Sequence, residues 1–152
     1  MSRVQLALNV NDIDEAVTFY SKLFGAEPAK RRPGYANFAV AEPPLKLVLL
    51  ENPGQGGSLN HLGVEVADIS AVDAEQTRLA ATGLDLAGER DTTCCYAKQD
   101  KFWIKDAPNG ESWEFYTVLE DSATFYGQDD TQACCGGPAG TSAGTAAGTS
   151  CC

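Results

Sequence analysis

Residues 5–13 read Gln-Leu-Ala-Leu-Asn-Val-Asn-Asp-Ile, and residues 61–69 read His-Leu-Gly-Val-Glu-Val-Ala-Asp-Ile. In both stretches apolar residues alternate with polar or small ones, which predicts a β-strand with one buried face. Each stretch then reaches an aspartate, Asp12 or Asp68, whose side chain is suited to cap the first turn of a helix. The pattern occurs twice, and it indicates that the chain contains an internal repeat.

The segments that follow the two copies also correspond. Glycines at positions 25 and 83 can each end a helix in the left-handed conformation. We expect helices over 13–24 and 69–82, strands over 35–40, 45–51, 101–106 and 112–119, and weaker strands over 28–32 and 85–91. Each half is then strand–helix–three strands, and neither half can bury its sheet face alone. The predicted class is α+β, with one domain over 1–120 built from paired modules at 1–52 and 58–120.

The composition excludes several classes of protein. The 152 residues carry a formal charge of −10, and only the triplet at 30–32 resembles a basic patch, so we expect no nucleic-acid partner. No apolar run approaches the roughly 20 residues that span a bilayer, so we expect no membrane partner. The first residues lack the apolar core of a signal peptide. We expect a cytoplasmic protein that acts on a small molecule, and a homodimer is left open.

All six cysteines occur in adjacent pairs, Cys94-Cys95, Cys134-Cys135 and Cys151-Cys152. Neighbouring cysteines close only a strained ring, so they cannot staple distant parts of a chain. Two soft thiolates side by side suit Cu(I), Zn or trivalent arsenic. The last two pairs fall in a Gly/Ala/Ser/Thr-rich segment, which predicts a flexible tail over 127–152. These tail cysteines either pass soft ions toward a site or are incidental.

Three residues are candidates for a metal site. Gln5 and His61, the single histidine of the chain, occupy equivalent positions in the repeat, and a pseudo-twofold axis would bring them together. Glu114 presents a carboxylate from an otherwise apolar strand. One imidazole, one carboxylate and one amide could hold a divalent metal and leave positions open for catalysis. Structural roles remain as alternatives, such as an ion pair of Glu114 with Lys46 or Lys105.

Four motifs stand out beside these residues: 5–12, Phe-Tyr-Ser-Lys-Leu-Phe-Gly at 19–25, Asn-His-Leu-Gly-Val at 60–64, and Asp-Ala-Pro-Asn-Gly at 106–110 followed by Trp113-Glu114. Together they resemble the glyoxalase/bleomycin-resistance/extradiol-dioxygenase superfamily, also called vicinal oxygen chelate proteins. The resemblance covers residues 1–118. It implies two paired βαβββ modules that form a curved mixed sheet around a metal cleft. It also implies metal ligands on the first, fifth and last strands, which here are Gln5, His61 and Glu114.

A narrower resemblance concerns the substrate. Residues 92–98 read Thr-Thr-Cys-Cys-Tyr-Ala-Lys, and Asp-Lys-Phe-Trp follows at 100–103. This is similar to the cadmium-inducible and organoarsenical carbon–arsenic lyase branch. It implies an Fe(II)-dependent dioxygenase that uses O2 to cleave trivalent methyl- and aryl-arsenicals into inorganic arsenite. A histidine is common at the first-strand ligand position, where this chain has Gln5, so other divalent metals could take the place of Fe(II).

Cys94 and Cys95 are the expected arsenic ligands. Two thiolates can replace both hydroxyls of R–As(OH)2 and leave the As–C bond intact. Since adjacent residues of a strand point to opposite faces, we expect these cysteines on a loop or another irregular segment. The polar run at 91–93 favours a loop, which could close over the cleft. Lys98 is expected either to lower the pKa of the thiols or to be an ordinary surface lysine, and Lys101 is expected on the surface. Tyr96 is expected either to line the substrate slot or to pack in the core.

Two other functions are weighed against this one. The same fold could sequester As(III) or Cd(II) on its thiols without any chemistry. A metal-dependent isomerase would need a fourth ligand from the first half, where residues around Leu47 and Val48 are apolar. Phe102, Trp103 and Tyr116 either line the substrate slot or pack in the core.

Overall fold

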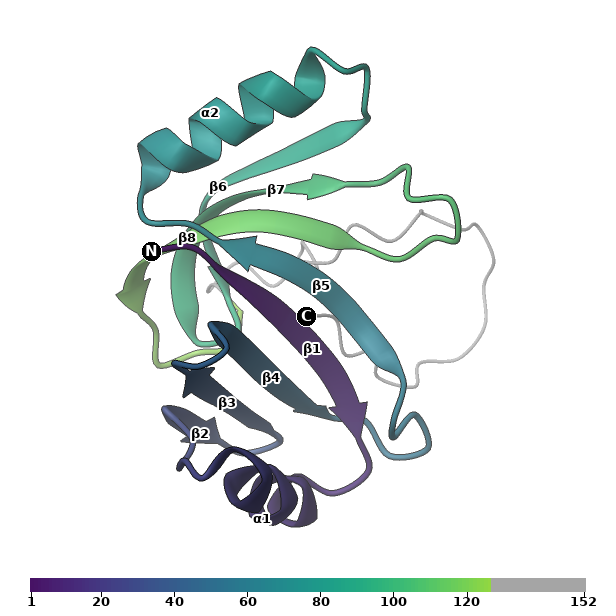
Figure 1. Cartoon of the computed structure of the whole chain (residues 1–152), viewed down its shortest axis with the longest axis vertical. Coiled ribbons are helices and arrows are strands. Elements are labelled where there is room, and N and C mark those ends of the chain that lie inside the picture. The colour runs from purple at the N-terminus through teal and green to yellow at the C-terminus, as the bar shows by residue number, and fades with distance from the viewer. Residues whose placement is uncertain (127–152) are drawn as a thin grey trace.

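The computed structural model describes residues 1–126 and contains one eight-stranded sheet that curls on itself (Figure 1). The strands lie in the order β2-β3-β4-β1-β5-β8-β7-β6. The elements are β1 (Arg3–Val10), α1 (Ile13–Phe24), β2 (Lys30–Arg32), β3 (Tyr35–Val40), β4 (Leu45–Glu51), β5 (Leu59–Glu65), α2 (Ile69–Ala80), β6 (Leu86–Cys94), β7 (Ala97–Ile104) and β8 (Trp113–Asp121).

The centre of the sheet joins two copies of one structural unit. β1 and β5 run antiparallel, with Gln5 opposite Gly63 and Ala7 opposite His61. β4 lies parallel to β1 on one side, and β8 lies parallel to β5 on the other. Each unit is strand–helix–three strands, so the predicted α+β fold with two paired βαβββ modules is confirmed.

Both helices begin where an aspartate caps them, and α1 also ends at its predicted glycine, whereas α2 ends at Ala80, before the predicted end at residue 82. The Asp12 carboxylate accepts hydrogen bonds from backbone N–H groups in the first turn of α1, which ends at Gly25 in the left-handed conformation (φ 61°). Asp68 caps α2 in the same way. Val17 of α1 and Val72 of α2 are buried in separate apolar clusters, one beneath each helix. The helices therefore attach each module's sheet to its own core.

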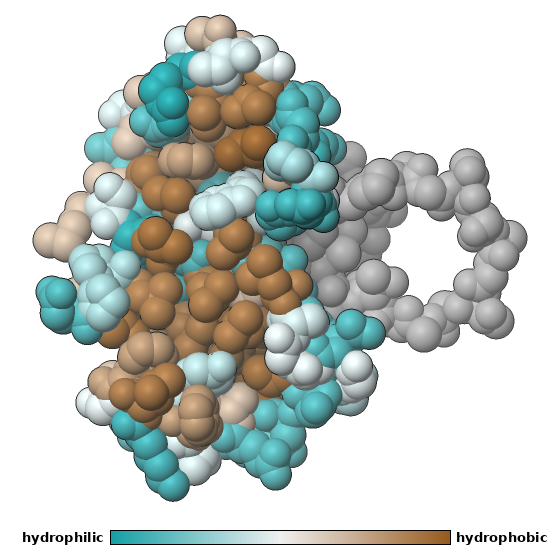
Figure 2. Space-filling view, turned by 45° about the vertical axis from the view of Figure 1, so that its right-hand side comes forward, coloured by the Kyte–Doolittle hydropathy of each residue, from teal (hydrophilic) through white to brown (hydrophobic). Residues whose placement is uncertain are grey.

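The helices leave the outer face of the two central strands uncovered (Figure 1). Helix contacts run from α1 to β3 and β4 and from α2 to β7 and β8. Val4 on β1 and Leu59 on β5 are 49% and 42% exposed. Figure 2 shows apolar residues gathered across the middle of the molecule in that view. The other face of the sheet curls around a cavity.

The predicted boundaries hold for α1, β3 and β4, and they differ most in the second half. The loop or irregular segment predicted for the two cysteines is limited to the turn at Cys95 and Tyr96, because β6 continues through Cys94 and β7 already begins at Ala97. Thr92 pairs with Gln99 and Cys94 with Ala97. Pairing across this hairpin, together with the pairing of β7 with β8, places a polar, threonine-rich segment in a strand despite its lack of apolar alternation.

Within residues 1–126, no helix combines the length and apolar character needed to cross a membrane. The tail predicted over 127–152 lies outside the described residues, as do Cys134, Cys135, Cys151 and Cys152.

Candidate functional site

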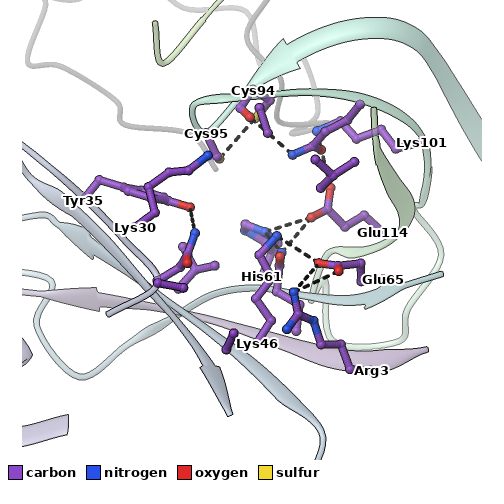
Figure 3. Close-up of a pocket in the computed structure, with 18 of the residues that line it drawn as sticks. Arg3, Lys30, Tyr35, Lys46, His61, Glu65, Cys94, Cys95, Lys101 and Glu114 are labelled. Carbon is purple, nitrogen blue, oxygen red and sulfur yellow. Dashed lines mark hydrogen bonds and ion pairs between the residues drawn. The ribbon is translucent and has the colours of Figure 1, made fainter. Parts of the chain in front are cut away.

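A cavity of about 350 Å³ lies between the two modules, and every strand of the sheet contributes to its lining. Gln5, His61 and Glu114 lie on its floor strands β1, β5 and β8, which are neighbours in the sheet. Cys94 and Cys95 line the same cavity, and Figure 3 shows them across the open space from His61 and Glu114. The sheet thus brings together residues that are far apart in the sequence.

The three candidate metal ligands converge on one point. Gln5 Nε2 lies 2.9 Å from His61 Nε2 and donates a hydrogen bond to Glu114 Oε1 at 2.8 Å. His61 Nε2 lies 3.3 Å from Glu114 Oε1. All three residues are at most 4% exposed. The structure therefore places these residues within reach of a single ion, as a shared site requires.

Gly63 makes this convergence sterically possible. It lies opposite Gln5 on β1 and beside Glu114 on β8. A Cβ at this position would stand 3.0 Å from the Glu114 Cγ and 3.4 Å from the Gln5 Cβ. Any larger residue would push the two side chains away from their present positions.

Two neighbours set the charge and tautomer of the site. Burial alone would raise the pKa of the Glu114 carboxyl, but nearby positive charge, chiefly the Lys101 ammonium, outweighs burial and holds the pKa at about 2. The Lys101 ammonium lies 3.4 Å from Glu114 Oε2. Asn60 Oδ1 lies 2.8 Å from His61 Nδ1, and an N–H donated there leaves the lone pair of Nε2 facing the cavity.

These residues fit a divalent metal ion. Glu114 Oε2 is buried and has no hydrogen-bond partner within the described part of the chain. His61 Nε2 and Glu114 Oε1 are both acceptors aimed at one point, where the Gln5 amide now donates. Rotating that amide by 180° would present its oxygen instead, giving one nitrogen and two oxygen donors.

The first module offers no further ligand at the symmetric position. Glu114 pairs with Gly63, and in the other copy Val48 pairs with Ala7, so Val48 is the structural counterpart of Glu114. Val48 lines the cavity and is 3% exposed. The apolar character predicted for this position is confirmed.

The two cysteines lie at a tight hairpin turn and not on a long loop. Cys94 ends β6, and Cys95 and Tyr96 form the turn to β7, with positive φ angles of 55° and 60°. The turn brings the two Sγ atoms to 3.2 Å, which a regular strand would not do. Cys94 is disulfide-bonded in this structure, but not to Cys95, because 3.2 Å is too long for an S–S bond.

Lys101 and Lys98 occupy the reverse of their expected environments. Lys101 is 1% exposed and pairs with Glu114, so the surface position predicted for it is wrong. The alternation of β7 places it on the cavity side with Trp103. Lys98 is absent from the cavity lining and pairs with Asp91 and Glu120, and these two carboxylates occupy the ammonium that was expected to act on the thiols.

The aromatic residues divide between cavity and core. Trp103 lines the cavity, with its ring 5.5 Å from the His61 ring, whereas Phe102 stacks on a neighbouring phenylalanine in the core. The Tyr96 ring is absent from the cavity lining and packs at 5.3 Å against Tyr35. An aromatic slot that includes Tyr96 is therefore not what the structure has.

A polar network beside Gln5 was not anticipated from the sequence. Tyr116 Oη lies 2.5 Å from Gln5 Oε1 and 2.9 Å from Glu65 Oε2. Glu65 in turn accepts from Arg3 at 2.9 Å and from Lys46 at 3.1 Å. Lys46 therefore pairs with Glu65 and not with Glu114. Alternation along β8 puts Tyr116 on the same face as Glu114, a signal that could have found it.

Comparisons with known proteins find close relatives in sequence and a shared fold. A trivalent organoarsenical cleaving enzyme of Thermomonospora curvata is 55% identical over the full length of both chains. The cadmium-induced protein CadI of Mycobacterium tuberculosis is 67% identical over 82% of each chain. A Mn(II)-bound glyoxalase from Novosphingobium aromaticivorans has the same fold, with a TM-score of 0.55, 21% identity, and coverage of 82% of this chain and 42% of that one.

The family model that matches the chain covers both modules. Residues 3–115 fit the model of the Glyoxalase/Bleomycin resistance protein/Dioxygenase superfamily, a span that begins at the first strand and includes Gln5, His61 and Glu114. The chain belongs to this superfamily.

Proposed function

We propose that this protein cleaves the carbon–arsenic bond of trivalent organoarsenicals and releases inorganic arsenite. One structural observation carries the proposal: the dithiol turn and the Gln5, His61 and Glu114 cluster line one cavity. A thiophilic arsenic atom held at the turn would place its organic group inside that cavity. The name of the full-length Thermomonospora relative supports the same substrate class.

We further propose Fe(II) as the resident metal, with Gln5, His61 and Glu114 as its ligands. One imidazole, one carboxylate and one amide oxygen leave positions open, as non-haem iron oxygenases require. When bound, Fe(II) would supply the redox chemistry that lets dioxygen react with the substrate. Lys101 keeps the Glu114 carboxylate ionised, and Asn60 orients the His61 ring so that Nε2 faces the cavity.

Cys94 and Cys95 capture arsenic in the reduced protein. Each thiol proton leaves with one hydroxyl of R–As(OH)2, so two As–S bonds form, two As–O bonds break and two water molecules depart. The As–C bond is untouched by this exchange. Because Cys94 is disulfide-bonded in the structure, capture requires prior reduction. We propose a cytoplasmic location, whose thiol pool would provide that reduction.

The overall cleavage balances for a methyl substrate without an added reductant. CH3As(OH)2 and O2 together contain the atoms of As(OH)3 and formaldehyde. The C–As bond breaks, carbon gives up four electrons, dioxygen takes up four, and arsenic stays trivalent. The protein's contribution is to hold the two reactants in one orientation, between the turn and the apolar walls at Trp103 and Val48.

The decisive experiment follows oxygen and arsenic together. The full chain is reduced, loaded with Fe(II) without oxygen, and given methylarsenite or phenylarsenite with and without O2. We expect arsenite to form only with O2, in step with oxygen uptake. Glu114→Gln should abolish turnover, whereas Glu120→Gln, on the exposed end of the same strand, should not.

The cysteines have their own test. Cys94→Ser and Cys95→Ser should each lose turnover while the protein still binds Fe(II). Unchanged turnover in either variant would refute the capture role. Tight binding of As(III) or Cd(II) with no oxygen uptake in any condition would instead establish a thiol-based trap, the function that a cadmium-induced relative leaves as the alternative.

A further inference from the structure

The hydroxyl of Tyr116 has two acceptors and one proton. Its oxygen lies 2.5 Å from Gln5 Oε1 and 2.9 Å from Glu65 Oε2, and the side chain is fully buried. A phenol can donate only one strong hydrogen bond, although its oxygen can also accept. If the proton goes to Glu65, two oxygen atoms face each other across the gap to Gln5.

Glu65 is the stronger of the two acceptors. Its carboxylate is held by the Arg3 guanidinium at 2.9 Å and by the Lys46 ammonium at 3.1 Å, so it is fixed in place and ionised. Hydrogen bonds to an ionised carboxylate are about twice as strong as those to a neutral amide oxygen. The Tyr116 proton therefore favours Glu65 over Gln5.

Rotation of the Gln5 amide by 180° would remove this conflict. The amide N–H would then donate to Tyr116, and Tyr116 would donate to Glu65. The same rotation turns Gln5 Oε1 toward His61 Nε2 and Glu114 Oε1, the two acceptors that Nε2 contacts now. Three acceptors at one point repel one another unless a cation lies between them.

The two orientations of the amide thus suit different contents of the site. With nitrogen inward, the amide satisfies His61 and Glu114 by itself. With oxygen inward, the amide can ligate a cation, because an amide binds metals through oxygen and not through its delocalised nitrogen. Whatever favours the second orientation raises the affinity for the cation.

We propose that Tyr116, oriented by Glu65, is a positioning residue that turns the Gln5 oxygen toward His61 and Glu114 and so strengthens binding of a divalent cation. This inference rests on the proposed metal site, and it does not depend on which substrate is cleaved. It also explains how a glutamine, which has a donor and an acceptor at its tip, can serve in a ligand set.

The test measures Mn(II) affinity of the reduced full chain by electron paramagnetic resonance of the free ion. Tyr116→Phe should weaken Mn(II) binding about tenfold, the effect of one lost hydrogen bond. Glu65→Gln should also weaken it, because the Tyr116 proton then returns to Gln5 Oε1 and holds the nitrogen inward. Tyr20→Phe, on α1 away from the cavity, is the matched control and should bind as the unmodified chain does.

The double variant Tyr116→Phe with Glu65→Gln separates the effect of the Gln5 amide orientation from the effect of the Glu65 charge. Removing the Glu65 charge weakens cation binding directly, and that part should persist in the Tyr116→Phe background. The part that acts through the amide should disappear there. The loss of Mn(II) binding free energy in the double variant should therefore be smaller than the sum of the losses in the two single variants. Circular dichroism of each variant checks that the fold is retained.

Three results would overturn the inference. They are unchanged Mn(II) affinity in Tyr116→Phe, strictly additive losses in the double variant, and Mn(II) binding that is absent or that His61→Ala leaves unchanged. A chain that binds Mn(II) as expected but leaves arsenicals intact would instead contradict only the proposed cleavage.

Discussion

At the scale of single residues, Gly63 sets the spacing of the candidate ligands. An added methyl group would stand 3.0 Å from Glu114 and 3.4 Å from Gln5, closer than side chains normally approach. We predict that Gly63→Ala weakens Mn(II) binding about tenfold or more, since small misplacements of ligands are costly. Gly88→Ala is the control, because its methyl group would meet only the flexible end of Gln76. Equal affinity in the two variants would show that this spacing is not required.

Glu114 should also make stability depend on acid. Its pKa is about 2 in the folded protein against 4.5 ordinarily, so the stability from its ionised form is present above about pH 4.5 and is lost as the pH falls toward 2. In chelator, the free energy of unfolding should therefore drop between about pH 5 and 3, by no more than about 3 kcal/mol. Urea titrations should show a shallower drop for Glu114→Gln, and an unchanged one for Glu120→Gln. Identical slopes in all three proteins would contradict the depressed pKa.

Sequence reasoning predicted residues that the structure brings together where the pattern of one strand decides which face a residue occupies. Position in the repeat selected Gln5 and His61, and alternation selected Glu114. Lys101 was misplaced because a lysine is rarely buried unless it is paired, and its partner lies on another strand. The link from Gln5 through Tyr116 to Glu65 depends on three neighbouring strands and their register, which a single sequence does not contain.

At the scale of elements, the β6–β7 turn holds two non-glycine residues in the left-handed conformation. Such a conformation costs roughly 1 kcal/mol for an ordinary side chain and little for glycine. We predict that Tyr96→Gly is more stable than Tyr96→Ala by about 1 kcal/mol, although both lose the ring that packs on Tyr35. Urea unfolding of the two variants measures the difference. In an ordinary strand alanine is the more stable of the pair, so that order at position 96 would disprove the strained turn.

The contrast between helices and hairpin shows what local sequence can decide. α1 was predicted to the residue, because Asp12 and Gly25 are local capping signals and the apolar spacing is helical. The β6–β7 hairpin carries neither glycine nor asparagine at its turn, and β6 lacks apolar alternation. The hairpin is held in the sheet by the pairing of β7 with β8, as between Ala97 and Asp121, and that pairing lies outside any short window of sequence.

At the scale of the whole molecule, a second connection joins the modules opposite the β1–β5 seam. Lys30 on β2 donates to the backbone oxygen of Tyr96 at 2.9 Å and pairs with Asp121 at the end of β8. We predict that Lys30→Met increases hydrogen exchange of the β6–β7 turn and lowers stability by no more than about 1 kcal/mol. Lys22→Met on α1 should leave that exchange unchanged. Mass spectrometry of exchanged peptides distinguishes the two, and equal protection would mean that the turn is held by its own hairpin alone.

Val48 makes the two sides of the cavity chemically different, although the two modules share one architecture. Since its mate in the other copy is an acid, the two halves of the chamber differ: one side presents hydrocarbon, the other presents charge. A guest tethered at the hairpin would meet these two sides differently, with its carbon portion against the valine side and its reacting bond toward the acid side. Two identical copies could not make the two sides of the cavity different, and here the difference depends on one strand position that the copies do not share.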